Sequence, residues 1–164
     1  MRTPDFDSAH PDEYVIALAT AKAKAGRAPE NSLILGCDTI VMHQDRLLEK
    51  PSNRNQAIEY LSLLADDWHR VYTGIALWQP STRRLLTASE MTRVQFGPMT
   101  LKEIKSYVAT GEPLDKAGAY GIQEKGALLI KELRGDYFNV VGLPLFRLTV
   151  LLTRFNIFLS DLLE

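Results

Sequence analysis

Apolar residues recur at helical spacing in four segments of the chain. The predicted helices cover residues 11–25, 53–65, 101–110 and 143–155. Pro11 and the acidic residues after it suit the first turn of a helix, and Asn53 is a favourable N-cap. Gly26 and Gly111 follow two of these segments, where glycine commonly ends a helix. We therefore expect four helices with defined ends.

Short apolar and β-branched runs predict strands between these helices. They cover residues 32–42, 69–79, 84–96 and 127–133. A Pro-Ser-Thr turn joins the second strand to the third, and residues 43–51 form a loop or a short hairpin. Residues 112–126 and 134–144 are predicted as loops. Because there is no internal repeat and no linker, we expect a single α/β domain over residues 1–164.

The composition is that of a globular protein. Of 164 residues, 46% are hydrophobic and 24% are charged, and 10 Gly, 8 Pro and 1 Cys exclude collagen-like, low-complexity and disulfide-scaffold proteins. A formal net charge of -1 supplies no overall basic field for nucleic acid. The N-terminus lacks the pattern of a secretory signal, and no apolar run reaches membrane-spanning length. We expect a cytoplasmic protein that binds neither nucleic acid nor membrane.

Asp38 and Thr39 interrupt the first apolar strand. A carboxylate in such a strand is unfavourable unless it is hydrogen-bonded, paired with a cation or bound to a metal. Two interpretations stay open from the residues alone. Asp38 is either a functional carboxylate or a structural residue that caps a strand end.

Two further segments offer polar groups to a ligand. Lys50 precedes Pro51, and a lysine fixed in this way meets a phosphate as a compact charge, although an ordinary solvated loop lysine is the commoner case. Lys116 and Gln123 lie in a loop of small residues, which let a backbone approach a ligand closely. This loop lacks the spacing of a Walker motif, and a structural turn is the alternative.

Other polar residues are weaker candidates. The turn at residues 135–139 suits local capping better than catalysis. The histidines at positions 10, 43 and 69 lack the spacing of metal ligands. Cys37 has no histidine nearby in sequence, so we expect a small strand residue rather than a nucleophile.

Seven segments belong together: LATAKA, LGCDTIV, EKP, VYTGIAL, TRVQF, YVATGEPLDKAGAYGIQEKGA and GDYFNVVGLPL. In their residues and their order they resemble the Maf family of nucleoside triphosphate pyrophosphatases, from about Tyr14 to about Phe155. The Pro113–Gln123 run and GDYFNVVGLPL are the most specific parts. The resemblance implies a mixed sheet with flanking helices, in a two-lobed fold with a central cleft related to inosine triphosphate pyrophosphatases.

The resemblance also implies the chemistry. Family members cleave a nucleoside triphosphate to the monophosphate and pyrophosphate with a divalent metal, Mg²⁺ or Mn²⁺. The AGAYGIQ form of the loop is similar to the branch that acts on dTTP and UTP, and differs from the branch that acts on 7-methyl-GTP. By this resemblance Asp38 is the proton acceptor and the metal-associated carboxylate, and Thr39 and Gln123 match positions tied to base or substrate choice.

Three lysines match the family's substrate-binding positions by the same resemblance: Lys22 in the helix motif, Lys50 before the proline, and Lys116 in the long loop. Lysines and a metal ion can neutralise the charge that develops on the leaving pyrophosphate, while Asp38 orients or deprotonates the attacking water.

The sequence departs from the family near its N-terminus. Family members begin with a strand, a Ser-x-Ser-Pro-Arg-Arg loop and a helix, whereas this sequence starts after that unit. We therefore expect an N-terminally truncated fold with part of the phosphate-binding set. Ser81–Arg84 is similar in its letters, but lies in a predicted hairpin turn. The family's acidic pair falls at Asp5–Ser8, where Asp7 is the candidate substitute.

Two functions follow from these observations. The leading hypothesis is a pyrophosphatase that hydrolyses dTTP, UTP or modified pyrimidine nucleotides. The alternative is a catalytically impaired remnant that binds nucleotide or another protein. The C-terminal NIFLSDLLE runs past the usual family end, where its apolar residues cover surface, join a homodimer interface, or add one more helical turn.

Overall fold

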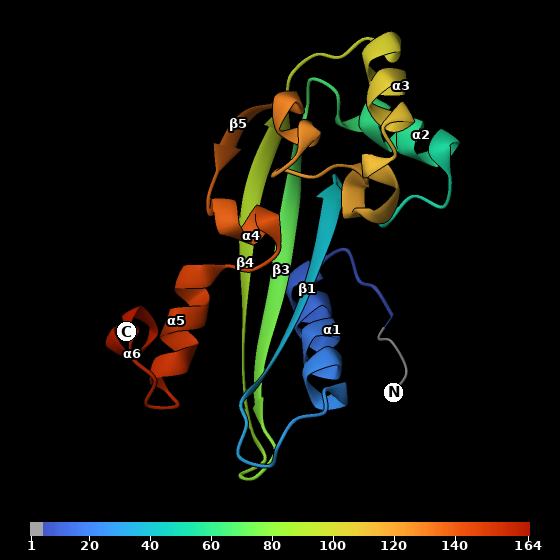
Figure 1. The fold of residues 1–164 in the computed structure, drawn as a ribbon. Helices are drawn as coiled ribbons and strands as arrows, with labels where there is room; N and C mark the ends of the chain where they lie inside the picture. Colours follow the sequence, from blue (N-terminus) through green and yellow to red (C-terminus); the bar gives the residue numbers. More distant parts are fainter. Residues whose placement is uncertain (1–4) are drawn as a thin grey trace.

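The computed structural model describes residues 5–164, which form one antiparallel sheet with helices against both faces (Figure 1). The helices are α1 (Pro11–Ala25), α2 (Arg54–Leu64), α3 (Leu101–Ala109), α4 (Tyr137–Val141), α5 (Leu145–Thr153) and α6 (Leu159–Leu163). The strands are β1 (Ile34–His43), β2 (Arg46–Leu48), β3 (Trp68–Gln79), β4 (Arg84–Phe96) and β5 (Ile130–Arg134). Their order in the sheet is β2-β1-β3-β4-β5.

Every strand pairing in the described residues is antiparallel, so the expectation of a mixed sheet is wrong for this part of the chain. The connections account for two of these pairings. Tight turns join β1 to β2 and β3 to β4, and such turns produce antiparallel neighbours. A parallel pair needs a longer crossover that returns the chain to the same end of the sheet. The α/β class with flanking helices agrees with the sequence prediction, and the fifth strand, β2, lies in the segment expected as a loop or a short hairpin.

The ends of the helices follow the predicted local signals. The side chain of Asn53 accepts a hydrogen bond from the backbone N–H of Gln56 at 3.0 Å and caps α2. Thr100 and Glu103 form a reciprocal capping box at the start of α3. Gly111 follows α3 with a φ of 82°, a left-handed conformation that glycine adopts without strain.

Helix α1 lies directly against the backbone of β1 and β3 (Figure 1). The contact depends on two glycines. A Cβ atom added to Gly36 would lie 2.1 Å from the carbonyl oxygen of Ala19, and one added to Gly74 would lie 2.3 Å from that of Val15. Only glycine permits this approach, which brings the last turns of α1 beside the middle of β1.

The larger core lies on the opposite face of the sheet. The fully buried Phe96, Leu61 and Leu64 belong to it, together with residues of α2, α3 and the loop after α3. Helices α2 and α3 pack over the end of the sheet where β1 finishes (Figure 1). This core fixes the long loop at residues 112–126 beside the end of β1, since Ala119 and Tyr120 are buried in it.

Two segments differ from the sequence prediction. Residues 127–129 belong to a 3-10 turn, so β5 begins only at Ile130. Residues 134–144, predicted as a loop, contain the short helix α4, which Asp136 caps by accepting from the N–H of Phe138 at 2.8 Å. The long loop at residues 112–126 holds three short 3-10 turns, η1 (Glu112–Asp115), η2 (Ala117–Ala119) and the start of η3 (Lys125–Leu129).

The C-terminal residues form α5 and α6, which lie at the side of the sheet near β4 (Figure 1). The segment 156–164 includes the helical turn that the sequence analysis gave as one option. Phe146 and Leu163 expose more than three quarters of their surface in this region. No helix among residues 5–164 combines the length and the apolar character that crossing a membrane requires.

Candidate active site

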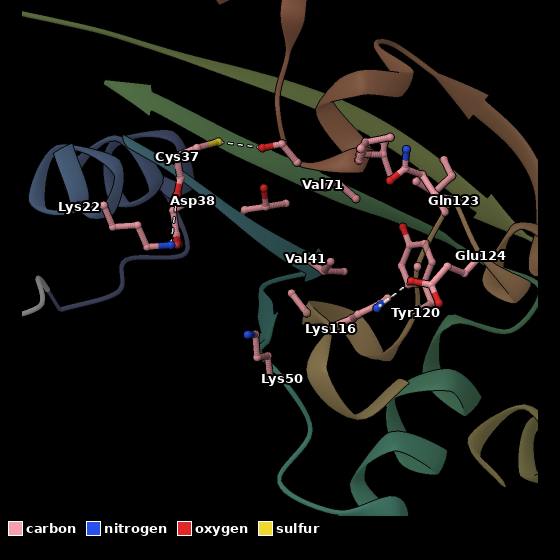
Figure 2. Close-up of a pocket in the computed structure, with 17 residues that line it drawn as sticks. Lys22, Cys37, Asp38, Val41, Lys50, Val71, Lys116, Tyr120, Gln123 and Glu124 are labelled. Carbon is pink, nitrogen blue, oxygen red and sulfur yellow. Dashed lines mark hydrogen bonds and ion pairs between the residues drawn. The ribbon is translucent and has the colours of Figure 1, made fainter. Parts of the chain in front are cut away.

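A cavity of about 480 Å³ opens between β1, the end of α1, the long loop and the end of α4 (Figure 2). All six residues that the sequence analysis selected line it: Lys22, Asp38, Thr39, Lys50, Lys116 and Gln123. They come from a helix, a strand and two loops that are far apart in the sequence. The fold therefore collects the predicted chemical groups in one place.

Asp38 lies in β1 at the level where this strand has no partner on its outer side among the described residues. Strand β2 pairs only with Val41–His43, whereas β3 pairs with Asp38 through Gly74 on the inner side. The Asp38 side chain is 18% exposed, and the Lys22 ammonium donates a hydrogen bond to its carboxylate (Figure 2). Lys22 also donates to the carbonyl oxygen of Cys37 at 3.1 Å. The ion pair stabilises the negative charge of Asp38 in this half-open position.

Lys116 lies across the cavity from Asp38 (Figure 2). Its ammonium lies 3.1 Å from the Asp115 carboxylate and 3.2 Å from that of Glu124. Burial acts to lower the pKa of Lys116, but the hydrogen bonds and charges of Asp115 and Glu124 outweigh it and raise the pKa. Lys116 is therefore a firmly protonated cation at neutral pH.

The backbone around Lys116 leaves no room for larger residues. A Cβ atom added to Gly121 would lie 2.6 Å from the Cε atom of Lys116. Gly118 has a φ of 67° and packs against Val41 of β1. The small residues of the loop thus let the Lys116 stem and the loop backbone approach β1 closely, as the sequence pattern suggested.

Lys50 follows β2 and faces the cavity from below Lys116 in Figure 2. The preceding residue joins the two loops, because the carbonyl oxygen of Glu49 accepts a hydrogen bond from the N–H of Gly118 at 3.3 Å. Three lysines therefore line a cavity that has two carboxylates, Asp38 and Glu124, in its wall. This excess of positive charge suits a ligand with several phosphate groups.

A chain of hydrogen bonds that starts at Thr39 connects β1 with α4. The Thr39 hydroxyl lies 2.8 Å from the Thr73 hydroxyl, which donates to the carbonyl oxygen of Asn139 at 2.9 Å. Asn139 is fully buried and donates through its side chain to the carbonyl oxygen of Val71 at 3.0 Å. The turn at residues 135–139 thus carries capping and packing contacts, in agreement with the sequence analysis.

Several residues that the sequence analysis did not select also line the cavity, above all Cys37, which it expected to be a small strand residue, and the segment 140–142. The Cys37 thiol donates to the carbonyl oxygen of Gly142 at 2.7 Å and links this segment to β1. Burial, followed by the charge of Asp38, raises the pKa of the Cys37 thiol to about 11. The thiol stays protonated at neutral pH, in keeping with a structural role. Strand alternation was the available signal, because it places Cys37 on the same face as Thr39.

Two other sequence candidates lie outside the cavity lining. Asp7 accepts hydrogen bonds from the N–H of Ala9 and from the His10 ring, both at 2.9 Å, at the exposed entry to α1. Ser81–Arg84 lies in the exposed turn between β3 and β4, as predicted. Each of these segments has a local explanation in the fold.

The described residues contain no cluster of three or more His, Cys, Asp or Glu side chains placed to hold a metal ion. Asp38 alone offers a carboxylate beside Lys22 in this cavity wall. Magnesium typically uses one or two protein carboxylates and completes its shell with water and substrate phosphates. The residues present thus fit an oxygen-coordinated ion that is shared with a phosphate ligand.

Comparisons with known proteins agree with the geometry. The sequence profile of the Maf family, described as "Maf-like protein", matches residues 1–155. A dTTP/UTP pyrophosphatase of Halalkalibacterium halodurans is 52% identical over 137 residues, which are 83% of this chain and 71% of the relative. One of Bacillus cytotoxicus is 48% identical over 147 residues, covering 89% of this chain and 76% of the relative. One of Bacillus anthracis is 48% identical over 149 residues, covering 90% and 76%.

These matches cover most of the chain and most of each relative. Their sequence identities are well above the level at which homologous proteins share a fold. They include the helix, strand and loop segments that line the cavity. The chain belongs to the Maf family.

Proposed function

We propose that this protein is a nucleotide pyrophosphatase that hydrolyses dTTP and UTP, or modified pyrimidine nucleotides, to the monophosphate and pyrophosphate. Relatives that are 48% and 52% identical carry the name dTTP/UTP pyrophosphatase. The observation that carries the proposal is the meeting of Asp38 with Lys22, Lys50 and Lys116 in one cavity of about 480 Å³. A carboxylate among several lysines suits hydrolysis of a polyanionic phosphoanhydride.

In this proposal the lysines bind the triphosphate. Lys116 and Lys50 lie on the side of the cavity formed by the loops, and Lys22 lies beside Asp38. A lysine presents a compact charge with three donors, so it can follow the phosphate oxygens as charge moves to the leaving group. The ion pairs of Lys116 with Asp115 and Glu124 hold its ammonium in place until phosphate oxygens replace them.

Asp38 is the proposed proton acceptor. The water oxygen bonds to the α-phosphorus, and the bond from this phosphorus to the oxygen that bridges the α and β groups breaks. Pyrophosphate leaves with that bridging oxygen, and the proton of the water passes to the Asp38 carboxylate. A general base contributes a factor of about 10²–10⁴ to such a reaction. The hydrogen bond from Lys22 holds the carboxylate in place in the wall of the cavity.

We propose Mg²⁺ or Mn²⁺ as the cofactor. Asp38 would hold the ion together with oxygens of the nucleotide, because magnesium commonly uses one or two protein carboxylates and completes its shell with water and phosphate oxygens. The ion supplies charge neutralisation on the phosphates when it is bound. Thr39 and Gln123 are the proposed residues of substrate choice, because both line the cavity with groups that can donate or accept hydrogen bonds.

Four further points stay predictions. They are the two-lobed fold related to inosine triphosphate pyrophosphatases, the single domain over residues 1–164, the cytoplasmic location and the homodimer.

A panel of nucleoside triphosphates with Mg²⁺ or Mn²⁺ tests the proposal, with the products separated by anion-exchange chromatography. We expect UMP from UTP and dTMP from dTTP, each with one equivalent of pyrophosphate, and loss of turnover when EDTA removes the metal. Formation of UDP and phosphate would contradict the proposed bond cleavage. Binding of UTP without turnover would instead favour the catalytically impaired remnant.

A further inference from the structure

The loop that carries Lys116, Gln123 and Glu124 is anchored from behind by two residues that do not line the cavity, Tyr107 and Glu112. Tyr107 lies in the last part of α3, and Glu112 begins the 3-10 turn η1. The Tyr107 hydroxyl donates to the Glu112 carboxylate at 2.7 Å. The pair thus lies between the core of α2 and α3 and the loop backbone.

The pair binds the loop backbone at two places. The N–H of Gly121 donates to the Tyr107 hydroxyl at 3.3 Å. The N–H groups of Lys125 and Gly126 donate to the two oxygens of the Glu112 carboxylate, at 3.1 Å and 2.9 Å. Gln123 and Glu124 lie between these two anchored points, so the anchors define where their side chains enter the cavity.

Close packing strengthens this arrangement. A Cβ atom added to Gly126 would lie 2.5 Å from the carbonyl oxygen of Gly121 and 2.7 Å from the Tyr107 hydroxyl. A Cβ atom on Gly121 would meet the Lys116 stem at 2.6 Å. The position of Gly121 therefore determines the path of Lys116 as well. Figure 2 shows Lys116, Gln123 and Glu124 on the side of the cavity away from Lys22 and Asp38.

The ionisation of both groups supports these hydrogen bonds. Burial acts to raise the pKa of Glu112, but the hydrogen bonds from Tyr107, Gly126 and Lys125 outweigh it and lower the pKa. Burial, with the hydrogen bond to Glu112, raises the pKa of the Tyr107 hydroxyl. At neutral pH Glu112 is a carboxylate that accepts, and Tyr107 is a neutral hydroxyl that donates.

We propose that Tyr107 and Glu112 are positioning residues of the nucleotide-binding loop, which hold Gln123 and Lys116 in the geometry that binds the substrate. The role in catalysis rests on the proposed pyrophosphatase function. The anchoring of the loop does not, since it is a property of the protein without nucleotide. Neither residue touches the cavity, so neither is a catalytic residue.

The test uses Glu112→Gln and Tyr107→Phe, with Glu30→Gln and Tyr137→Phe as matched controls at exposed positions. In the nucleotide-free protein, hydrogen exchange at the amides of Gly121 and Gly126 is expected to become at least tenfold faster in both variants and in neither control. A glutamine keeps one acceptor oxygen, and a phenylalanine keeps the ring, so folding is expected in both. Unchanged exchange in both variants would overturn the proposal, whether or not the protein hydrolyses nucleotides.

Kinetics separate positioning from a merely structural role. In Glu112→Gln the KM for UTP is expected to rise about tenfold, the effect of one lost charge-assisted hydrogen bond, while kcat changes less than threefold. In a Gln123→Ala background the same substitution is expected to raise KM less, because one of the two residues that it positions is absent. An equal rise of KM in both backgrounds would show that Glu112 does not act through Gln123. Absence of turnover in the wild type would reject the proposed function, and the exchange data alone would then decide the anchoring.

Discussion

Lys22 of α1 donates a hydrogen bond to the carboxylate of Asp38 in β1. The two residues are brought together because Gly36 and Gly74 let α1 lie against the strand backbone. In the described residues no strand pairs with Asp38 on the outer side of β1, and the Lys22 ammonium lies beside its carboxylate. The same contact that packs the fold also prepares the charge at the centre of the candidate site.

Replacement of Lys22 by methionine is expected to reduce kcat/KM for UTP by about tenfold or more, because a charge-assisted hydrogen bond to Asp38 or to a phosphate is lost. Stability is expected to change by less than about 1 kcal/mol, since the Lys22 side chain is 57% exposed and such pairs contribute little. Steady-state kinetics and thermal unfolding measure the two effects.

Lys24→Met is the matched control for that substitution. Lys24 lies on the same helix, but its ammonium is 5.4 Å from the centre of the Trp78 ring and it does not line the cavity. Its activity is expected to equal that of the wild type. A similar loss of activity in both variants would indicate a general effect of charge on the helix rather than a role for the Lys22–Asp38 pair.

Gly36→Ala is expected to lower the free energy of unfolding by about 3 kcal/mol, because its Cβ would lie 2.1 Å from the carbonyl oxygen of Ala19 and force α1 away from β1. Denaturant unfolding measures this loss. Gly97→Ala is the control, since the nearest atom to its added Cβ is 4.0 Å away. Equal stability of the two variants would contradict the close contact of α1 with the sheet.

His69 is expected to make the protein sensitive to acid. Burial, aided by the charge of His43, lowers the pKa of His69 from 6.5 to about 3, although the charge of Asp67 opposes this. Between these two pH values the unfolded chain binds a proton at this position and the folded protein does not. Stability is therefore complete above pH 6.5 and falls toward pH 3, by up to about 1.4 kcal/mol per pH unit.

Urea unfolding at several pH values between 7.5 and 4 checks this prediction against His69→Gln, which lacks the titrating group. Between pH 6.5 and pH 4 the free energy of unfolding of the wild type is expected to fall more steeply than that of the variant. The two slopes are expected to differ by up to about 1.4 kcal/mol per pH unit. His10→Gln serves as the opposite case, because the hydrogen bond with Asp7 raises the pKa of His10, so the stability of this variant is expected to rise more steeply with pH than that of the wild type. Parallel curves for the wild type and His69→Gln would show that His69 does not stay neutral in the folded protein.

The sequence predicted the local structure well where the signals are themselves local. Asn53 caps α2 through its own side chain, and apolar and β-branched runs mark β3 and β4. Helix α4 was missed because a five-residue helix has little intrinsic signal. Its position depends on the buried contacts of Asn139 with Val71 and Thr92, which come from distant parts of the chain.

The candidate site could be predicted only in part from the residues themselves. An acid in an apolar strand drew attention to Asp38, but Lys22 is an ordinary helix lysine until α1 is packed against β1. Only the family resemblance indicated Lys22 as a residue of the site. The anchoring of the loop by Tyr107 and Glu112 depends on backbone hydrogen bonds, for which neither composition nor spacing gives a signal.

The most direct test of Asp38 as the proton acceptor is pyrophosphate release from UTP and dTTP by the wild type and by Asp38→Asn, with Asp45→Asn as a control in the exposed turn between β1 and β2. We expect release by the wild type and by Asp45→Asn, and a rate lower by a factor of about 10²–10⁴ in folded Asp38→Asn. Release by Asp38→Asn at the wild-type rate, or none by folded wild-type protein, would contradict this assignment.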